Sequence, residues 1–188
     1  AVIVAAGKGE RAGLSYNKVL KNIAGFRLYI HSLKVFHQDP ECTDIIVVAS
    51  KRDLPIIKAE ASSYGAHTVI GGKTRRKSVN EGLRLVKSPY VFIHDAARPF
   101  IAEPVLFRLK EALRHYDAVS PALPVPDTLK KVENGIITAS LERSGVYGLQ
   151  TPQAFTTHVL KEAHGVASRE NIDAPCDITL TTELVGIR

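Results

Sequence analysis

The sequence of 188 residues contains no methionine and no tryptophan, and its only cysteines are Cys42 and Cys176. Two cysteines do not make a disulfide framework, so we expect both thiols to be free. No apolar run reaches the length of a membrane span, and no signal peptide is evident. These absences favour a soluble protein of the cytoplasm. Because methionine is absent and the chain begins within a strand-like run, we also expect residues to be missing at its ends and at internal positions.

The positive charge of the chain is not concentrated in one place. The formal net charge is +6, and the seven histidines include no pair at metal-ligand spacing. No basic cluster is longer than Thr74-Arg75-Arg76-Lys77. A basic pocket for phosphorylated small molecules explains this distribution at least as well as a nucleic-acid surface does. We therefore expect neither a nucleic acid nor a membrane as a partner.

Short apolar runs alternate with segments of helical periodicity along most of the chain, which predicts an α/β domain over residues 1–188. The expected fold is a Rossmann-like, mostly parallel sheet with helices on both faces. The predicted strands lie at 1–5, 44–49, 67–70, 89–93 and 117–123. The predicted helices lie at 27–37, 54–64, 75–86, 103–115 and 156–163.

The first strand runs into a glycine-rich loop, Ala5 to Lys18, which has the composition of a phosphate cradle. Small residues let the backbone approach a ligand, and successive N–H groups can bind an anion. The pattern Gly7-x-Gly9-x-x-Ala12 also fits a dinucleotide fingerprint, but the next strand is too distant, and Lys51-Arg52 follows it. A P-loop would need Gly-Lys-Ser/Thr, which is absent. An ordinary glycine-rich loop remains the alternative.

Two further strand ends carry candidate ligand-binding residues. Gly71-Gly72 precedes a predicted helix whose N-terminus favours anions or polar acceptors, with Ser78 on its first turn. The alternative is a solvated basic face. Asp95 ends the next strand and could hold a metal ion bound to phosphates, or it could cap the following helix. Arg98 could be its salt-bridge partner.

The segment at about 124–150 breaks the α/β alternation. Two strand-like runs flank Asn134-Gly135, which is the strongest hairpin signal in a sequence. A hairpin inserted here has little core of its own, so it needs another surface. We expect that surface to be a partner subunit, with the hairpin acting as a dimerisation arm.

Four segments occur together in an order that resembles one family. They are AAGKGER with Lys18, GGxxRxxSV at 71–79, HDAARPF, and PVPDT…ER…QTPQAF. Over nearly the whole chain they resemble the 2-C-methyl-D-erythritol 4-phosphate cytidylyltransferases of the non-mevalonate isoprenoid pathway. The resemblance implies a nucleotide-binding α/β sheet, a β-arm exchanged across a homodimer, and Mg²⁺ or another divalent cation as the cofactor. It implies a location in a bacterial cytosol or, as a mature form, in a plastid stroma. It also implies in-line attack of methylerythritol phosphate on the α-phosphorus of CTP, with release of pyrophosphate.

The resemblance assigns roles to particular residues. Arg11, Lys18 and Asp95 would be catalytic, and Asp95 would also face Mg²⁺. The residues that would bind CTP are Ala5, Ala6, Gly7, Lys8, Gly72, Ser78 and Ala96. The sugar-phosphate substrate would be bound by Arg98, Thr128, Arg143 and Thr151, with the arm reaching the site of the other subunit.

The sequence departs from the family pattern at several positions. Asn17 stands where many members have proline, Val19 replaces a common glutamine, and Lys73 replaces a common aspartate. Our alignment places Cys176 to Glu183 before the family's final strand, so the chain ends ahead of its substrate-binding lysine. In a second alignment, 177–182 is a degenerate form of that strand, with Thr179 in the lysine's place.

Three other functions stay open. One is a ribitol-5-phosphate cytidylyltransferase, although members of that family differ from this chain in the motifs HDAARP and RRKSV. Another is a non-catalytic nucleotide-binding homologue. The third is a dinucleotide-dependent oxidoreductase, which the spacing of the second strand disfavours.

Overall fold

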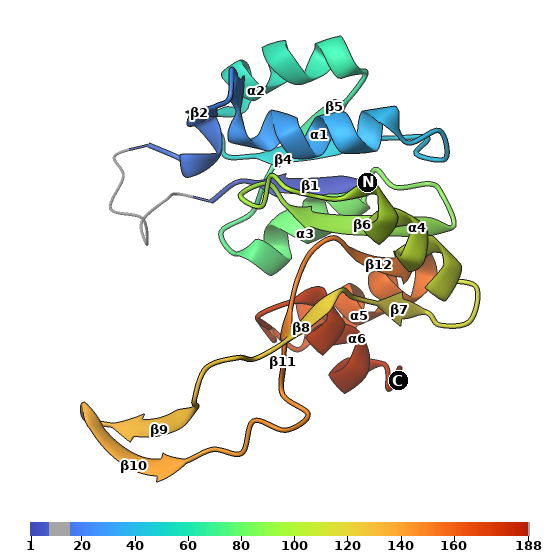
Figure 1. Ribbon diagram of the computed structural model, residues 1–188. Coiled ribbons are helices and arrows are strands. Elements are labelled where there is room, and N and C mark those ends of the chain that lie inside the picture. The colour runs from blue at the N-terminus through green and yellow to red at the C-terminus, as the bar shows by residue number, and fades with distance from the viewer. Residues whose placement is uncertain (8–15, 188) are drawn as a thin grey trace.

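The computed structural model describes residues 1–7 and 16–187, and a mostly parallel sheet forms its centre (Figure 1). Within the described residues the strand order is β5-β4-β1-β6-β12-β7. The first four of these strands are parallel, whereas β12 runs antiparallel to both of its neighbours. Their bounds are β5 His67–Ile70, β4 Ile46–Ala49, β1 Val2–Ala5, β6 Tyr90–Asp95, β12 Gln153–Thr156 and β7 Ala118–Val119. The predicted fold class is confirmed.

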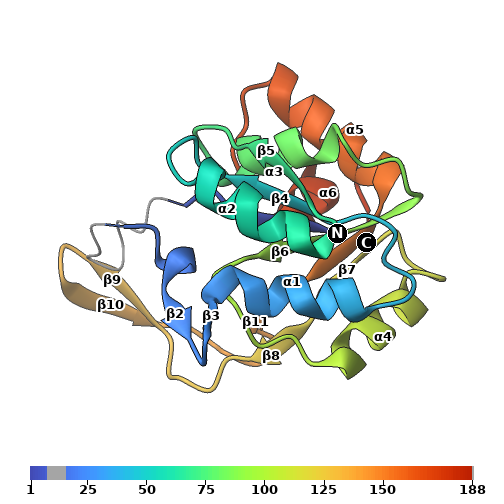
Figure 2. The same ribbon diagram turned by 90° about the horizontal axis from the view of Figure 1, so that it is seen from above.

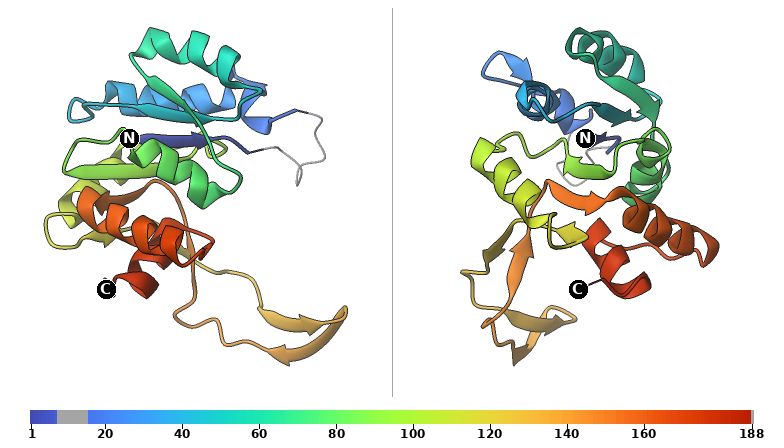
Figure 3. Two further views of the ribbon diagram at one scale, coloured as in Figure 1. Left: turned by 180° about the vertical axis from the view of Figure 1, so that it is seen from behind. Right: turned by 90° about the vertical axis from the view of Figure 1, so that its right-hand side faces the viewer.

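Helices cover both faces of this sheet (Figures 2 and 3). One face packs against α1 (Leu28–Gln38), α2 (Leu54–Ala61) and Leu106 of α4 (Glu103–Ala112). The other face packs against α3 (Arg75–Leu83) and α5 (Thr157–Arg169). The last helix, α6 (Asp177–Leu184), lies on α5 through apolar contacts that include Leu180.

Alternation along the central strands explains this double coverage. In β1, Ile3 belongs to the core of the α1 face, whereas Val2 belongs to the core of the α3 face. Val47 and Val48 of β4 divide in the same way. All four side chains are fully buried, as expected for a parallel strand covered on both sides.

Several predicted elements differ in their extent: α3 and α4 each end three residues earlier than predicted, at Leu83 and Ala112, and α5 continues six residues further, to Arg169. The predicted helix 54–64 is α-helical only to Ala61, and a 3₁₀ turn, Ser62–Tyr64, completes it before Gly65 with φ 67°. The predicted strand 117–123 is divided into β7 and β8 (Ala122–Pro124). Pro121 lies at the break and has no N–H with which to continue the ladder.

The predicted hairpin is confirmed, and it forms an arm that projects from the sheet (Figures 1 and 3). At its root β8 pairs with β11 (Tyr147–Leu149), and at its tip β9 (Lys130–Glu133) pairs with β10 (Ile136–Ser140). Asn134 and Gly135 have φ of 52° and 79°, as a type I′ turn requires. The apolar tip residues are exposed, including Ile136 at 69% and Ile137 at 64%.

Two small elements follow the first loop. A 3₁₀ turn, η2, covers Lys18–Leu20, and a short hairpin pairs β2 (Asn22–Ile23) with β3 (Phe26–Arg27). Among the described helices, none combines the length and the apolar character that a membrane span requires.

Candidate active site

The carboxyl ends of four parallel strands meet at one edge of the sheet, where open α/β folds bind their ligands. Ala5, Ala6 and Gly7 end β1, and Asp95 ends β6. Gly71 and Gly72 follow β5 and lead into α3, which carries Ser78. Two residues assigned to the site, Lys8 and Arg11, lie outside the described residues.

Asn17 anchors the turn that presents Lys18. Its Nδ2 donates to the carbonyl of Ala5 at 2.7 Å and to Oδ2 of Asp53 at 3.1 Å, and its Oδ1 accepts from the N–H of Val19 at 3.3 Å. Asn17 is buried, whereas Lys18 is exposed. The turn is therefore fixed to the end of β1 by the Asn17 side chain. The proline that many family members have at this position could not make these hydrogen bonds.

Asp53 completes this anchor from the N-cap position of α2. Its burial opposes the charged form, but hydrogen bonds from Ser50, Arg52 and Asn17 hold the pKa of Asp53 below its ordinary value. A charged carboxylate thus accepts the Asn17 amide, and such a hydrogen bond is stronger than a neutral one.

The paired glycines are required by packing within the chain. A Cβ at Gly71 would lie 2.7 Å from Cβ of Ala6 and 2.8 Å from Oγ of Ser78. A Cβ at Gly72 would lie 2.5 Å from Cβ of Lys77. The buried Ser78 hydroxyl lies 2.9 Å from the Thr74 carbonyl and 3.3 Å from that of Gly72, to which it can donate. These contacts hold the start of α3 against the ends of β1 and β5.

Asp95 lies between two arginines. Oδ1 accepts from Nε of Arg75 at 3.0 Å, and Oδ2 lies 3.8 Å from Nε of Arg98. Arg75 also reaches the buried Asp177, with Nη1 2.6 Å from Oδ2. Arg75 is the arginine of the pattern GGxxRxxSV and belongs to the basic cluster, and Asp177 lies in the C-terminal segment that was aligned in two ways. Neither position carries a local signal for this contact.

Thr151 and His94 hold the end of β6, which carries Asp95, through a chain of two hydrogen bonds. The N–H of Asp95 donates to Oγ1 of Thr151 at 3.3 Å, and that oxygen lies 3.0 Å from Nδ1 of the buried His94. Ala96 is also fully buried in the α1-face core, and its N–H donates to the carbonyl of Val4 at 3.1 Å. Thr151 and Ala96 therefore contribute to the framework beneath the site.

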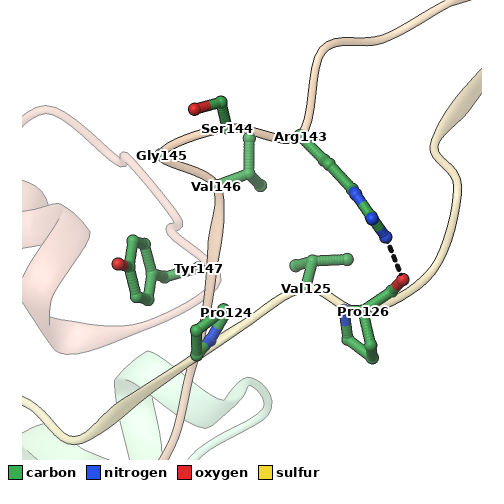
Figure 4. Close-up of a pocket in the computed structure, with 8 residues that line it drawn as sticks. All are labelled: Pro124, Val125, Pro126, Arg143, Ser144, Gly145, Val146 and Tyr147. Atoms are coloured by element: carbon green, nitrogen blue, oxygen red, sulfur yellow. Dashed lines mark hydrogen bonds between the residues drawn. The ribbon is translucent and has the colours of Figure 1, made fainter.

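Thr128 and Arg143 lie on the arm. Figure 4 shows Arg143 at the arm's root, where its Nη1 donates to the carbonyl of Pro126. Arg143, but not Thr128, borders an open hollow of about 470 Å³. The residues that line it are Pro124, Val125, Pro126, Arg143, Ser144, Gly145, Val146 and Tyr147.

The second alignment of the C-terminal segment is wrong. Residues 177–182 lie in the helix α6, not in a strand. Thr179 contacts Cys176, with Oγ1 3.3 Å from Sγ, within the first turn of that helix. It does not take the place of a lysine on a final strand.

The donor set at Asp95 fits a magnesium ion held largely by its substrate. Among the described residues no group of three His, Cys, Asp or Glu side chains could hold a metal by itself. Mg²⁺ is commonly bound through one or two carboxylates together with substrate phosphates. Asp95 supplies one carboxylate at the strand edge, with its side chain 31% exposed.

These features place the chain among the nucleotide-binding α/β proteins. The family model described as 2-C-methyl-D-erythritol 4-phosphate cytidylyltransferase (IspD) matches residues 1–188, and the chain belongs to this family.

Relatives and solved structures of the same description cover most of the chain. The protein of that name from Halalkalibacterium halodurans is 35% identical over 184 residues, which are 95% of this chain and 81% of the relative. The one from Geobacter metallireducens is 36% identical over 194 residues, covering 98% and 84%. The crystal structure of the Thermus thermophilus enzyme superposes with a TM-score of 0.84 at 30% identity, covering 100% of this chain and 85% of that one.

Proposed function

We propose that this chain joins CTP and 2-C-methyl-D-erythritol 4-phosphate to give 4-diphosphocytidyl-2-C-methyl-D-erythritol and pyrophosphate. The observation that carries the proposal is the match of the family model over the whole chain. The carboxyl edge of the sheet supports it, because Asp95 ends β6 at this edge and Asn17, which precedes Lys18, donates to the carbonyl of Ala5 at the end of β1.

The chemistry requires no nucleophilic side chain. The attacking group is the phosphate oxygen of the sugar, which is already an anion, and the leaving group is pyrophosphate. The difficulty is to bring two anions together and to stabilise charge on a five-coordinate phosphorus, for which positioning and fixed cations suffice. In the proposed site Lys18 and Arg11 hold the CTP phosphates, and Arg98 faces the sugar phosphate.

Asp95 is the proposed ligand of Mg²⁺. When bound there, the ion would supply charge stabilisation to the CTP phosphates. The chain's own contribution is to hold the carboxylate at the end of β6, through the Thr151 contact to its N–H and the Arg75 contact to Oδ1.

The arm is proposed to complete the site of a second subunit. Its tip exposes Val132, Ile136 and Ile137, and its root presents the cation of Arg143. An arginine can bind a phosphate through two parallel hydrogen bonds. In a homodimer joined through the arms, Thr128 and Arg143 of one chain would reach the methylerythritol phosphate bound by the other.

A pyrophosphate-release assay tests the activity. The protein is given CTP and Mg²⁺ with methylerythritol phosphate or ribitol 5-phosphate, side by side. We expect release with the first substrate and at least about tenfold less kcat/KM with the second, because a site built for one hydroxyl pattern leaves polar groups unpaired with another. Preference for ribitol phosphate would make the chain a ribitol-5-phosphate cytidylyltransferase. CTP binding without turnover of either substrate would make it a non-catalytic homologue.

A further inference from the structure

Arg75 bridges two carboxylates that are far apart in the sequence. Its Nε contacts Oδ1 of Asp95 at 3.0 Å, and its Nη1 contacts Oδ2 of Asp177 at 2.6 Å. The guanidinium is 27% exposed and Asp95 is 31% exposed, whereas Asp177 is only 1% exposed. One end of the bridge is thus at the site, and the other is inside the protein.

Asp177 is held firmly on its buried side. Its Oδ1 lies 2.9 Å from Nε2 of His164, which is also 1% exposed. Asp177 is the first residue of α6, where a helix N-terminus stabilises an anion. Burial opposes the charge, but the hydrogen bond from His164 and the charge of Arg75 hold the pKa of Asp177 below its ordinary value.

The packing of α6 on α5 does not require a charged side chain at Asp177. Leu180 packs α6 against Ala163 and Ala167 of α5, so apolar contacts already join the two helices. A buried ion pair is often no more stabilising than apolar residues of similar volume. The buried carboxylate is therefore better explained by what it does to Arg75.

An arginine that meets one carboxylate tends to bind both of its oxygens through two parallel N–H groups. Arg75 meets Asp95 through Nε alone, because the contact of Nη1 with Asp177 sets the orientation of the guanidinium. A side-on pair would also need Nη2 on Oδ2 of Asp95. Among the described residues that oxygen accepts no hydrogen bond, and it lies 3.8 Å from Nε of Arg98. The bridge thus limits how much of the Asp95 carboxylate Arg75 can cover.

We propose that Asp177, oriented by His164, is a positioning residue that restrains Arg75 and so keeps one oxygen of Asp95 open to a divalent cation. The inference rests on the proposed role of Asp95. Without the negative charge of Asp177, Arg75 moves onto both oxygens of Asp95 and competes with the cation.

The test measures CTP binding by calorimetry at increasing Mg²⁺, without the second substrate. Asp177→Asn keeps the size of the side chain and removes its charge. We expect it to need about tenfold more Mg²⁺ for half-maximal CTP affinity, the effect of losing one hydrogen bond to a charged group. Leu180→Ala is the matched control, because it destabilises α6 without touching the bridge and should leave the Mg²⁺ dependence unchanged.

A double-mutant cycle separates positioning from a structural role. If Asp177 acts through Arg75, the effect of Asp177→Asn on the Mg²⁺ dependence disappears when Arg75 is already alanine. An effect that persists in that background, or an unchanged Mg²⁺ dependence in Asp177→Asn, would overturn the inference. A parent protein that does not bind CTP would instead overturn the proposed function.

A crystal structure of the parent protein with CTP and Mg²⁺ gives a second test that needs no variant. We expect Arg75 to keep one N–H on each carboxylate. Two parallel hydrogen bonds from Arg75 to Asp95 in that complex would refute the proposal.

Discussion

Oγ1 of Thr151 lies 3.0 Å from Nδ1 of His94, which is the ring nitrogen that carries no proton. Nε2 of His94 lies 2.9 Å from the carbonyl of Arg98, which can only accept, so Nε2 must donate. In the neutral ring Nδ1 then accepts the hydroxyl proton of Thr151. The Thr151 oxygen in turn accepts the N–H of Asp95 at 3.3 Å. A neutral His94 therefore orders the strand end that presents Asp95.

This arrangement predicts a loss of stability in mild acid. Burial lowers the pKa of His94 from 6.5 to about 4. Below pH 6.5 His94 is protonated in the unfolded chain, whereas in the folded chain it stays neutral down to about pH 4. The free energy of unfolding therefore falls as the pH drops from 6.5 to about 4. The loss due to His94 should reach about 3 kcal/mol. Urea unfolding in metal-free buffer at pH 7.5 and pH 4.5 measures it.

Two variants isolate the contribution of His94. His94→Gln should show a smaller loss between the two pH values than the parent, because it removes the titrating ring. His115→Gln removes an exposed histidine and should behave as the parent does. An equal loss in all three proteins would show that His94 is not kept neutral by the fold.

The glycines of the two loops should respond differently to alanine. A Cβ at Gly72 would lie 2.5 Å from Cβ and 3.1 Å from the backbone carbonyl carbon of Lys77, so Gly72→Ala should lower the free energy of unfolding by about 1–3 kcal/mol. A Cβ at Gly7 meets no described atom within 4 Å, so Gly7→Ala should stay within about 0.5 kcal/mol of the parent.

Gly7→Ala should have a large effect on CTP affinity, although its effect on the free energy of unfolding is small. If its backbone passes close to the phosphates, Gly7→Ala should weaken CTP binding about tenfold, the effect of one lost hydrogen bond to a charged group. Calorimetry on the intact variant measures this. Unchanged affinity would remove Gly7 from the CTP site.

Lys18 should matter to turnover and not to folding. It is exposed on the turn that Asn17 anchors, so Lys18→Ala should lower kcat by about two to three decades, comparable with losing one preorganised donor. Lys21→Ala, at the other end of the same turn, is the matched control and should retain full activity. Turnover of Lys18→Ala within a factor of three of the parent would place Lys18 outside the site.

Mixing two inactive variants tests whether the site is shared. Arg143→Ala should bind methylerythritol phosphate poorly, and Lys18→Ala should fail in the nucleotide half of the site. If the arms cross a dimer, each mixed dimer regains one intact site. Random pairing makes half of the dimers mixed, so about a quarter of the parent activity should return. No recovery, with subunit exchange confirmed by mass, would mean that Arg143 does not serve the partner's site.

The fold could be predicted because its signals are local. The continuous apolar run of 44–49 predicts a strand buried on both faces, and Asn134-Gly135 predicts the turn of the arm. From the residues alone, site positions were predicted only at or just after strand ends, as at Asp95, whereas Arg143 and Thr128 were assigned to the site through the family resemblance. The Arg75–Asp177 contact joins positions 102 apart, and the His94–Thr151 contact joins positions 57 apart. Such pairs arise from the packing of helices and strands and have no periodicity to reveal them.

The root of the arm has a consequence for chain entropy. Because Ala122 pairs with Leu149 and Pro124 with Tyr147, the two ends of the excursion are held side by side before the tip begins. The cost of closing a loop grows only with the logarithm of its length, about 0.6 kcal/mol for each doubling. Lengthening or shortening the arm beyond β8 and β11 therefore changes the stability of the sheet very little. The length and sequence of the tip can vary without endangering the fold that carries it.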